Sequence, residues 1–358
     1  DGTIMRSRRG ELSLRVAGFT VLAKALRPPP DKHHGLADVE LRYRHRELDL
    51  LANEEARRLF MVRARVISAV RAHLDGEGFV EVETPVLQPI YGGALARPFV
   101  THHNELDRDL YLRIATELYL KRLIVGGLER VYELGKDFRN EGVSHKHNPE
   151  FTMVEWYEAY ADYRDEAERL EEVVRVAARA AAGTGEAAGA PAIDVERPWR
   201  RVSFVEAIAE ATGIDLHANP SAQELRRAIE ARGLEVGTEG ESWPGMADSL
   251  LAKYVEPSLL EPTFVFDYPI ELSPFARAHR DDPRLAERWE AFVGGIEVAN
   301  AFSELADADV QRERFESHRR GASGSDDTQP HDESFLVALE HGMPPTGGVG
   351  LGIDRLVM

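Results

Sequence analysis

The clearest alternation of apolar and polar residues lies between Glu129 and Tyr163. Apolar residues at even positions alternate there with charged residues at odd positions, which is the period of a strand with one apolar face and one polar face. A polar loop at 142–149 separates this run from a second alternating run. The pattern predicts a hairpin. If its two odd-numbered faces coincide, one concave surface carries Arg139, Glu141, Phe151, Glu155 and Tyr157.

Elsewhere, apolar residues recur at helical or strand spacing and predict the remaining elements. A polar, arginine-rich helix is expected at about 39–58, and it leads into a longer helix around residues 62–74. Further helices are expected at 116–125, 164–183, 204–212, 221–232, 246–254 and 283–292, and strands at 3–6, 12–16, 79–84, 110–114, 263–266 and 296–302. The Gly/Ala-rich segment 183–190 suggests a flexible connection, and the polar segment 318–333 suggests a mobile loop.

Composition narrows the function classes. A chain of 358 residues favours a large domain with one or two appendages. The apolar share is 43%, and no apolar run approaches the roughly 20 residues that span a bilayer. The net charge of −18 argues against a general basic surface for nucleic acid, so any RNA must bind locally. The absence of cysteine excludes disulfides, thiolate zinc sites and cysteine nucleophiles, and it fits a reducing compartment.

The polar face of the predicted hairpin carries a specific set of chemical groups. Arg139 presents a fork of donors that suits a carboxylate or a phosphate. Phe151 offers an aromatic plane for a purine, while Glu155 and Tyr157 suit an ammonium group. Periodicity alone fits equally well a hairpin whose charges pair with one another in solvent.

Two acidic residues, Glu290 and Glu297, flank the Gly294-Gly295 pair. Carboxylate oxygens suit a magnesium ion that also contacts phosphates, although surface carboxylates are the commoner explanation of such a pattern. Along the next strand Asn300, Phe302 and Glu304 share a face, whereas Glu297 has the opposite parity. A bulge near Ala299 is needed to bring all of them to one side.

Two other motifs invite interpretation. The glycine segment 347–352 lacks the spacing and the following acid of a dinucleotide loop, so it is better explained as a close-packed strand and helix start that presents Arg355. His102 and His103 are adjacent and would point apart on a strand, while His145 and His147 lie in the hairpin loop. A zinc site is therefore not favoured.

Three segments of the hairpin, FRNEG (138–142), HNPEF (147–151) and EWYEAYADY (155–163), closely resemble motif 2 of the bacterial lysyl-tRNA synthetases. GFVEVETPVL (78–87) is similar to motif 1 of that family, and GGVGLGIDR (347–355) is similar to motif 3. The resemblance covers nearly the whole chain from about residue 3. It implies the α+β class II aminoacyl-tRNA synthetase fold, an antiparallel sheet of about six strands flanked by helices.

The resemblance also implies a domain organisation. Residues 1–27 resemble the last part of an OB-fold anticodon-binding barrel, 28–55 form a linker, and 56–358 form the catalytic domain, with a helical insertion at about 200–260. Family members continue beyond the position of Met358. We therefore expect a chain truncated at both ends relative to the family.

By resemblance, the family's functional positions fall on named residues of this sequence. The resemblance implies that the catalytic residues are Arg139, Glu141 and Arg355. It implies that ATP contacts these three residues and also His147, Asn148, Phe151, Glu290 and Glu297, and that Glu290 and Glu297 hold magnesium. It implies that lysine contacts Gly93, Glu117, Arg139, Glu155, Tyr157, Asn300, Phe302 and Glu304. The implied partners are L-lysine, ATP, tRNA(Lys) and a second copy of the chain bound through motif 1. The implied location is the cytoplasm, with no membrane association.

Three functions remain open on these residues. The first is ligation of lysine to tRNA, and the second is a related transfer of activated lysine to a protein or, through lysyl-tRNA, to a lipid. The third is a catalytically silent, synthetase-like binding protein. Intact Arg139, Glu141, Glu290, Glu297 and Arg355 argue against the third.

Overall fold

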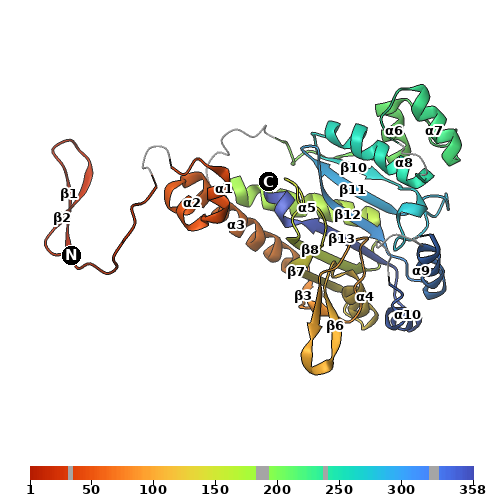
Figure 1. The fold of residues 1–358 in the computed structure, drawn as a ribbon, viewed down its shortest axis with the longest axis horizontal. Coiled ribbons are helices and arrows are strands. Elements are labelled where there is room, and N and C mark those ends of the chain that lie inside the picture. The colour runs from red at the N-terminus through yellow and green to blue at the C-terminus, as the bar shows by residue number, and fades with distance from the viewer. Residues whose placement is uncertain (31–34, 183–192, 237–240, 322–329) are drawn as a thin grey trace. The chain divides into compact units, whose positions relative to one another are not determined.

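A computed structural model describes residues 1–30, 35–182, 193–236, 241–321 and 330–358 of the chain (Figure 1). The chain divides into two compact units, Asp1–Met61 and Val62–Met358. No helix among these residues is both long enough and apolar enough to cross a membrane.

The first unit begins with an antiparallel hairpin of β1 (Gly2–Arg6) and β2 (Leu12–Val16), as the sequence predicted. Two short helices follow, α1 (Val39–Arg44) and α2 (Arg46–Ala52), before α3 (Glu54–Gly76) starts.

The single helix expected at 39–58 is therefore wrong, because the backbone leaves helical geometry at His45 and at Asn53. Buried Asp49 accepts hydrogen bonds from Arg42 Nε at 2.7 Å and from Asn53 Nδ2 at 2.6 Å. These local side-chain bonds favour two short helices over one continuous helix.

The second unit is built on an eight-stranded sheet in the order β3-β7-β8-β13-β12-β11-β10-β9. The strands are β3 (Val80–Glu81), β7 (Arg130–Phe138), β8 (Glu150–Ala159), β9 (Arg200–Ser203), β10 (Thr263–Phe266), β11 (Arg288–Val293), β12 (Ile296–Ser303) and β13 (Thr346–Gly352). The central pairs are antiparallel, and only the outermost pairs, β3 with β7 and β9 with β10, are parallel. The expected antiparallel sheet is present, with eight strands in place of about six.

The part of the chain between β3 and β7 forms a second sheet of three strands. It contains β4 (Leu87–Gln88), β5 (Val100–His103) and β6 (Arg108–Leu112), in the order β4-β6-β5, with a short 3-10 turn η1 (Asn104–Leu106).

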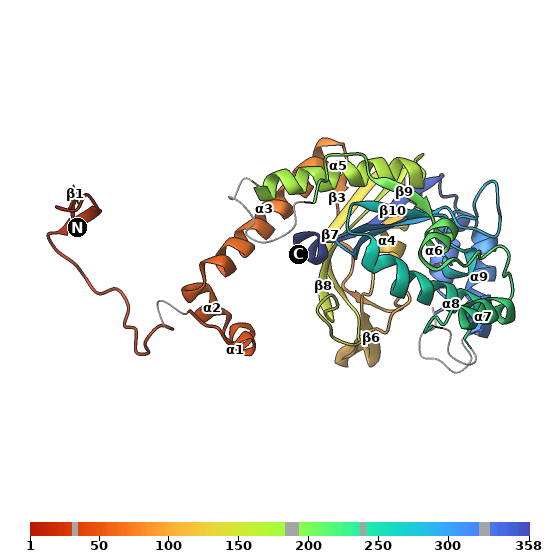
Figure 2. The ribbon, with the colours of Figure 1, turned by 90° about the horizontal axis from the view of Figure 1, so that it is seen from above.

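Helices cover both faces of the large sheet (Figure 2). On one face, residues 62–76 of α3 and α5 (Tyr163–Ala182) pack Val70 and Leu170 onto Trp156 and Trp289 of the sheet in one apolar cluster. On the other face lie α4 (Glu117–Val125), α9 (Ala308–Gly321) and α10 (Glu333–Glu340), whose cluster includes Tyr157.

A helical insertion covers the end of that second face near β9, β10 and β11. It comprises α6 (Phe204–Thr212), α7 (Ala222–Ala231), α8 (Trp243–Leu250) and the turns η2 (Leu251–Val255), η3 (Glu256–Ser258) and η4 (Ile270–Leu272). Its apolar residues pack on Val265 and Phe292 of the sheet. The three helices expected at 204–212, 221–232 and 246–254 are confirmed within a few residues.

The helix expected at 283–292 is wrong, because residues 283–287 are not helical and β11 (Arg288–Val293) follows them. Trp289 and Ala291 are buried in the α5 side of the sheet, while Glu290 between them lies on the opposite side. Gly294 and Gly295, at φ values of 65° and 74°, form the hairpin turn to β12. Glycine reaches positive φ without a Cβ penalty, so this pair was a hairpin signal.

The bulge expected near Ala299 is present at Val298. Ala291 pairs with Ala299 but Phe292 pairs with Glu297, so Val298 is the extra residue of β12. Asn300 pairs with Glu290, which places Glu297 and Asn300 on one face despite their opposite parity in the sequence.

The remaining expectations have mixed outcomes. The segment 183–190 lies outside the described residues. Of the loop expected at 318–333, residues up to Gly321 belong to α9, residues 322–329 lie outside the described part, and α10 begins at Glu333. The predicted strand and helix start at 347–352 is confirmed, since β13 leads directly into α11 (Ile353–Val357).

Candidate active site

The register of the β7–β8 hairpin determines which side chains share a face. Glu133 lies opposite Glu155, and Asp137 lies opposite Phe151. Residues directly opposite in an antiparallel pair project to the same side. The two odd-numbered faces therefore coincide, as the alternation predicted, and they face α4 rather than α5.

A buried acidic pocket lies between this face and α4. Glu155 accepts a hydrogen bond from the backbone N–H of Thr116 at 3.2 Å and another from the Tyr157 hydroxyl at 3.2 Å. Lys121 Nζ lies 2.5 Å from Glu117 Oε1 and also forms an ion pair with Glu304 Oε2. Three of the predicted lysine-binding carboxylates, Glu117, Glu155 and Glu304, are thus brought together with Tyr157.

Two glycines leave room for this pocket. A Cβ on Gly348, in β13, would overlap Glu304 Oε1 and the Tyr157 ring. Gly93 has a φ of 90°, and a Cβ there would lie 3.0 Å from Glu117 Cβ. The predicted lysine-binding residue Gly93 therefore lies against Glu117, and only glycine gives the backbone this approach.

The carboxyl groups of Glu155 and Glu304 have pKa values above the ordinary value of a glutamate. Burial, together with the charges of Asp137 and Glu117, raises the pKa of Glu155 to about 8, although the Thr116 hydrogen bonds oppose the shift. Burial likewise raises the pKa of Glu304 to about 8, opposed by Lys121. Shifts of this kind cluster at functional sites because desolvated like charges disfavour ionisation.

A second buried polar network contacts β7 through Glu133 and Asp137. Arg113 forms an ion pair with Glu133 and lies 3.2 Å from Asp137 Oδ1. Glu133 Oε2 also accepts a hydrogen bond from the Thr84 hydroxyl at 2.6 Å. This network fixes the strand that leads to Arg139. Nothing in local periodicity indicated it, because its members come from separate segments.

Arg139 and Phe151 form the opening of the site. The Arg139 guanidinium carbon lies 5.0 Å from the centre of the Phe151 ring. The Arg139 backbone N–H donates to Pro149 O at 2.8 Å, which holds the residue at the end of the hairpin. This contact is a cation–π interaction, which the sequence analysis did not predict.

Arg355 and Glu297 face the same opening from α11 and β12. Arg355 Nη1 donates to Glu297 Oε2 and to Glu297 O, both at 2.8 Å. Burial and the charges of Arg355 and Lys146 lower the pKa of His147, while Glu297 and Glu141 oppose the shift. The hairpin loop thus carries His147 and Glu141 into the electrostatic range of Arg355, although the side chains of Glu141 and Asn148 are exposed.

Glu290 is partly buried on the same face as Glu297. It accepts hydrogen bonds from Arg288 Nη2 at 2.5 Å and from the Tyr268 hydroxyl at 2.8 Å. Burial and the charge of Glu297 raise the pKa of Glu290 to about 7, although the charge of Arg288 opposes the shift. Two neighbouring carboxylates fit the oxygen ligands that magnesium takes when it also contacts phosphates.

Arg288 connects the two halves of the site and was not identified from the sequence. Its Nε donates to Asn300 Oδ1 at 3.1 Å, and its guanidinium carbon lies 5.5 Å from the Phe302 ring centre. Asn300 and Phe302 therefore lie between the Glu290 carboxylate and the acidic pocket.

The sequence does not indicate Arg288, because its pattern predicts a helix where β11 lies. Lys121 was also missed, although its i,i+4 spacing from Glu117 on an apolar helix was a local signal.

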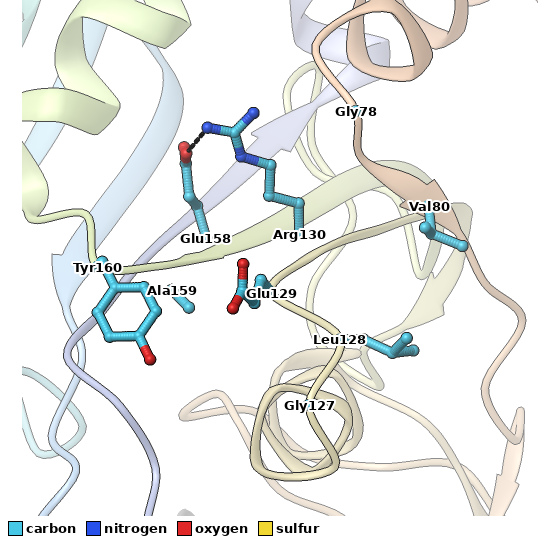
Figure 3. A pocket seen from close by; sticks show the side chains of 9 residues that line it. All are labelled: Gly78, Val80, Gly127, Leu128, Glu129, Arg130, Glu158, Ala159 and Tyr160. Atoms are coloured by element: carbon cyan, nitrogen blue, oxygen red, sulfur yellow. Dashed lines mark ion pairs between the residues drawn. The ribbon is translucent and has the colours of Figure 1, made fainter.

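Two further features lie apart from this site. In the described ranges of the chain, no three His, Cys, Asp or Glu side chains form a metal-binding cluster, and His102 pairs with Asp109 instead. A cavity of about 630 Å³ lies where β7 begins, lined by residues 127–130 and 158–160 with Gly78 and Val80 (Figure 3). Its Arg130–Glu158 ion pair of 2.6 Å projects from the opposite face of β8 to Glu155.

Comparison with known proteins agrees with this geometry. The family model described as tRNA synthetases class II (D, K and N) matches residues 38–358. The chain is 52% identical over 364 residues to the lysine–tRNA ligase of Moorella thermoacetica, covering all of this chain and 73% of that relative.

Other bacterial relatives show the same extent of similarity. The lysine–tRNA ligase of a Roseiflexus species is 54% identical over 359 residues, and that of Staphylococcus haemolyticus is 50% identical over 360 residues. All of this chain is covered in both cases, with 73% and 72% of the respective relatives.

Proposed function

Because the chain belongs to the class II tRNA synthetases of the D, K and N group, we propose that it activates L-lysine with ATP and transfers the lysyl group to tRNA(Lys). The observation that carries the choice of amino acid is the buried pocket of Glu117, Glu155 and Glu304. A buried cluster of carboxylates is costly unless cations pair with it, and lysine brings two ammonium groups.

The pocket would recognise lysine because its carboxylates are buried. Glu155, Tyr157 and Glu304 surround the ε-ammonium, while Glu117 beside Gly93 receives the α-ammonium. A shorter or uncharged side chain leaves buried acids without a partner, which costs binding energy. Asn300 and Phe302 bound the aliphatic part of the substrate between Arg288 and the pocket.

Activation requires little more than placement of the reacting groups. Arg139 holds the lysine carboxylate near the α-phosphate of ATP, while Phe151, His147, Asn148 and Glu141 bind the nucleotide. The ionised carboxylate attacks phosphorus and pyrophosphate leaves, so no protein nucleophile or general base takes part. Positioning and charge stabilisation supply the rate, with Arg355 on the phosphates.

Magnesium, when bound, neutralises phosphate charge, and Glu290 and Glu297 are the residues that would hold it. Glu297 pairs with Arg355 at 2.8 Å. In the proposal, Glu297 would be a ligand of the metal at the phosphates, and Arg355 would contact the phosphates as a cation.

The proposed partners are L-lysine, ATP and tRNA(Lys), with a second copy of the chain bound through the motif 1 region and a cytoplasmic location. Similarity to lysine–tRNA ligases over the whole chain favours transfer to tRNA over transfer to a protein.

The first test is lysine-dependent exchange of labelled pyrophosphate into ATP, with lysine, ornithine and arginine compared. Lysine should support exchange. Ornithine is one methylene shorter and should be poorer by roughly 10- to 200-fold in kcat/KM. Glu297→Ala should abolish exchange with every amino acid, whereas Glu304→Ala should weaken lysine selectivity.

The matched control is Glu168→Ala, which removes an exposed carboxylate on α5 far from the predicted site face. It should leave exchange unchanged. Folded wild-type protein that exchanges with no amino acid would favour the silent binding protein. Exchange without charging of tRNA(Lys) would favour transfer to another acceptor.

A further inference from the structure

Lys121 is the one cation that lies inside the acidic pocket within the described part of the chain. It projects from α4 and is fully buried. Its ammonium bridges Glu117 and Glu304, and it lies 5.4 Å from the centre of the Phe275 ring. A buried ammonium needs such partners, because burial without them favours the neutral amine.

Without Lys121, the ionised carboxylates of the pocket would carry one negative charge more than the two ammonium groups of lysine can neutralise. Glu117, Glu155 and Glu304 contribute three negative charges when ionised, and Lys121 contributes one positive charge. The difference is two negative charges, which equals the two ammonium groups of free lysine.

Glu304 also retains a free acceptor. Its Oε2 faces Lys121, while Oε1 is buried beside Gly348 and no described residue donates a hydrogen bond to it. Buried acceptors are seldom left without a donor in native proteins. Lys121 therefore holds Glu304 by one oxygen and leaves the other, which lies beside Gly348 and the Tyr157 ring, without a donor among the described residues.

We infer that Lys121 is a positioning and specificity-determining residue for the amino acid substrate. Its ammonium fixes Glu117 and Glu304 and reduces the pocket charge to two, so the pocket matches an amino acid with two ammonium groups. This inference depends on the proposed function, because it takes lysine as the substrate.

The surrounding titratable groups agree with this role. Burial opposes the charge on Lys121, but Glu117 and Glu304 outweigh it and raise the Lys121 pKa above its ordinary value. Glu155 and Tyr157 of β8 face the same pocket, and Asp137 of β7 lies behind Glu155. Removal of the Lys121 charge should therefore raise the pKa of Glu117 and Glu304 further.

The test compares Lys121→Met, which keeps the length and removes the charge, with Lys121→Arg, which keeps the charge. In pyrophosphate exchange at pH 7, Lys121→Met should raise the KM for lysine about tenfold or more, the equivalent of one pKa unit. The increase should shrink toward pH 8.5, where the pocket acids ionise again. Lys121→Arg should keep the wild-type pH profile, and the ATP KM should not change in either variant.

The control is Lys136→Met, which removes an exposed ammonium on β7 that pairs with Glu150 at 3.5 Å. It should match wild type. An unchanged lysine KM in folded Lys121→Met, or an increase of equal size at every pH, would overturn the inference. Wild-type protein without lysine-dependent exchange would instead overturn the proposed function.

If Lys121→Met does not fold, the wild type provides the measurement. In protein labelled with [15N]lysine, the Lys121 ε-ammonium signal is assigned by its loss in Lys121→Arg. It should remain cationic from pH 6 to 9, with and without bound lysine. Its conversion to a neutral amine in that range would contradict the role.

Discussion

Burial raises the pKa of Glu155 and of Glu304 to about 8 each, which favours the protonated form of these carboxyls at neutral pH. Bound lysine needs these groups as carboxylates. Protons therefore compete with the substrate as the pH falls through 8. The KM for lysine should rise from pH 8.5 to pH 6, by about tenfold per pH unit for each proton that must leave.

Calorimetry provides an independent check of this competition. Lysine binding at pH 7, measured in two buffers with different ionisation enthalpies, should release protons. A flat KM together with no proton release would mean that both carboxyls are already ionised in the free protein.

Residue roles could be predicted in part from the sequence. Arg139, Phe151, Glu155 and Tyr157 were found because they alternate along one hairpin, and their shared face is observed. Their ligands remain predictions. Lys121 was not found, because its second partner, Glu304, is distant in the sequence. A pattern within one helix does not reveal a contact made across the fold.

At the scale of elements, β13 lies between β8 and β12 and carries glycines where other strands carry side chains. A Gly348→Ala change would place a methyl group onto Glu304 and Tyr157. We expect it to reduce kcat/KM for lysine by at least about tenfold, since overpacking a buried site costs ~1–3 kcal/mol. Pyrophosphate exchange measures this effect.

Gly352→Ala is the matched control for that change. Gly352 ends the same strand, and the nearest atom to a Cβ there is 3.7 Å away. Its kinetics should resemble wild type. Equal defects in the two variants would mean that β13 tolerates no side chain at all, so the pocket would not explain Gly348.

The β11 strand is stabilised mainly through Trp289. This residue is fully buried, lies 4.8 Å from the Phe264 ring centre, and donates from Nε1 to Tyr163 O. Trp289→Ala should lower the free energy of unfolding by ~3–5 kcal/mol, measured by denaturant titration. Trp243→Ala, at the partly buried start of α8, should cost less. A larger loss at Trp243 would contradict the assignment of β11 to the main core.

Length did not decide which elements could be predicted from the sequence. The hairpin and α5 each extend over many residues of one period, and both are observed. The four-residue β10 lies where a strand was expected, and the two-residue β3 lies within the strand expected at 79–84. The prediction failed at β11, which has buried residues on both faces of the sheet, such as Trp289 and Phe292, and so lacks the strict alternation of a strand with one exposed face.

For the whole second unit, one sheet carries two chemically distinct regions on the same face. Glu290, Glu297 and Arg355 lie at one end, and the acidic pocket with Lys121 lies at the other. Removal of magnesium by a chelator should therefore abolish pyrophosphate exchange but leave lysine affinity within about twofold by calorimetry. Loss of lysine binding on chelation would mean that the two regions are not independent.

The fold class could be predicted for the whole molecule because the three motifs resemble one family, and the family match to residues 38–358 confirms it. The domain boundaries stay a prediction. The compact units divide at Met61, within α3, because contacts rather than motifs define them.

The extra residue at Val298 also determines which changes of chain length this protein can tolerate. Deleting it would leave Glu297 and Asn300 two positions apart, so plain strand alternation would keep both on one face, with Glu297 still opposite Phe292 and Ala299 still opposite Ala291. Deleting Ala301 instead would make Asn300 and Phe302 neighbours and turn one of them to the α5 side, although no functional side chain is removed. In a deletion scan of the gene, we therefore expect β12 to tolerate the loss of Val298 better than the loss of Ala301.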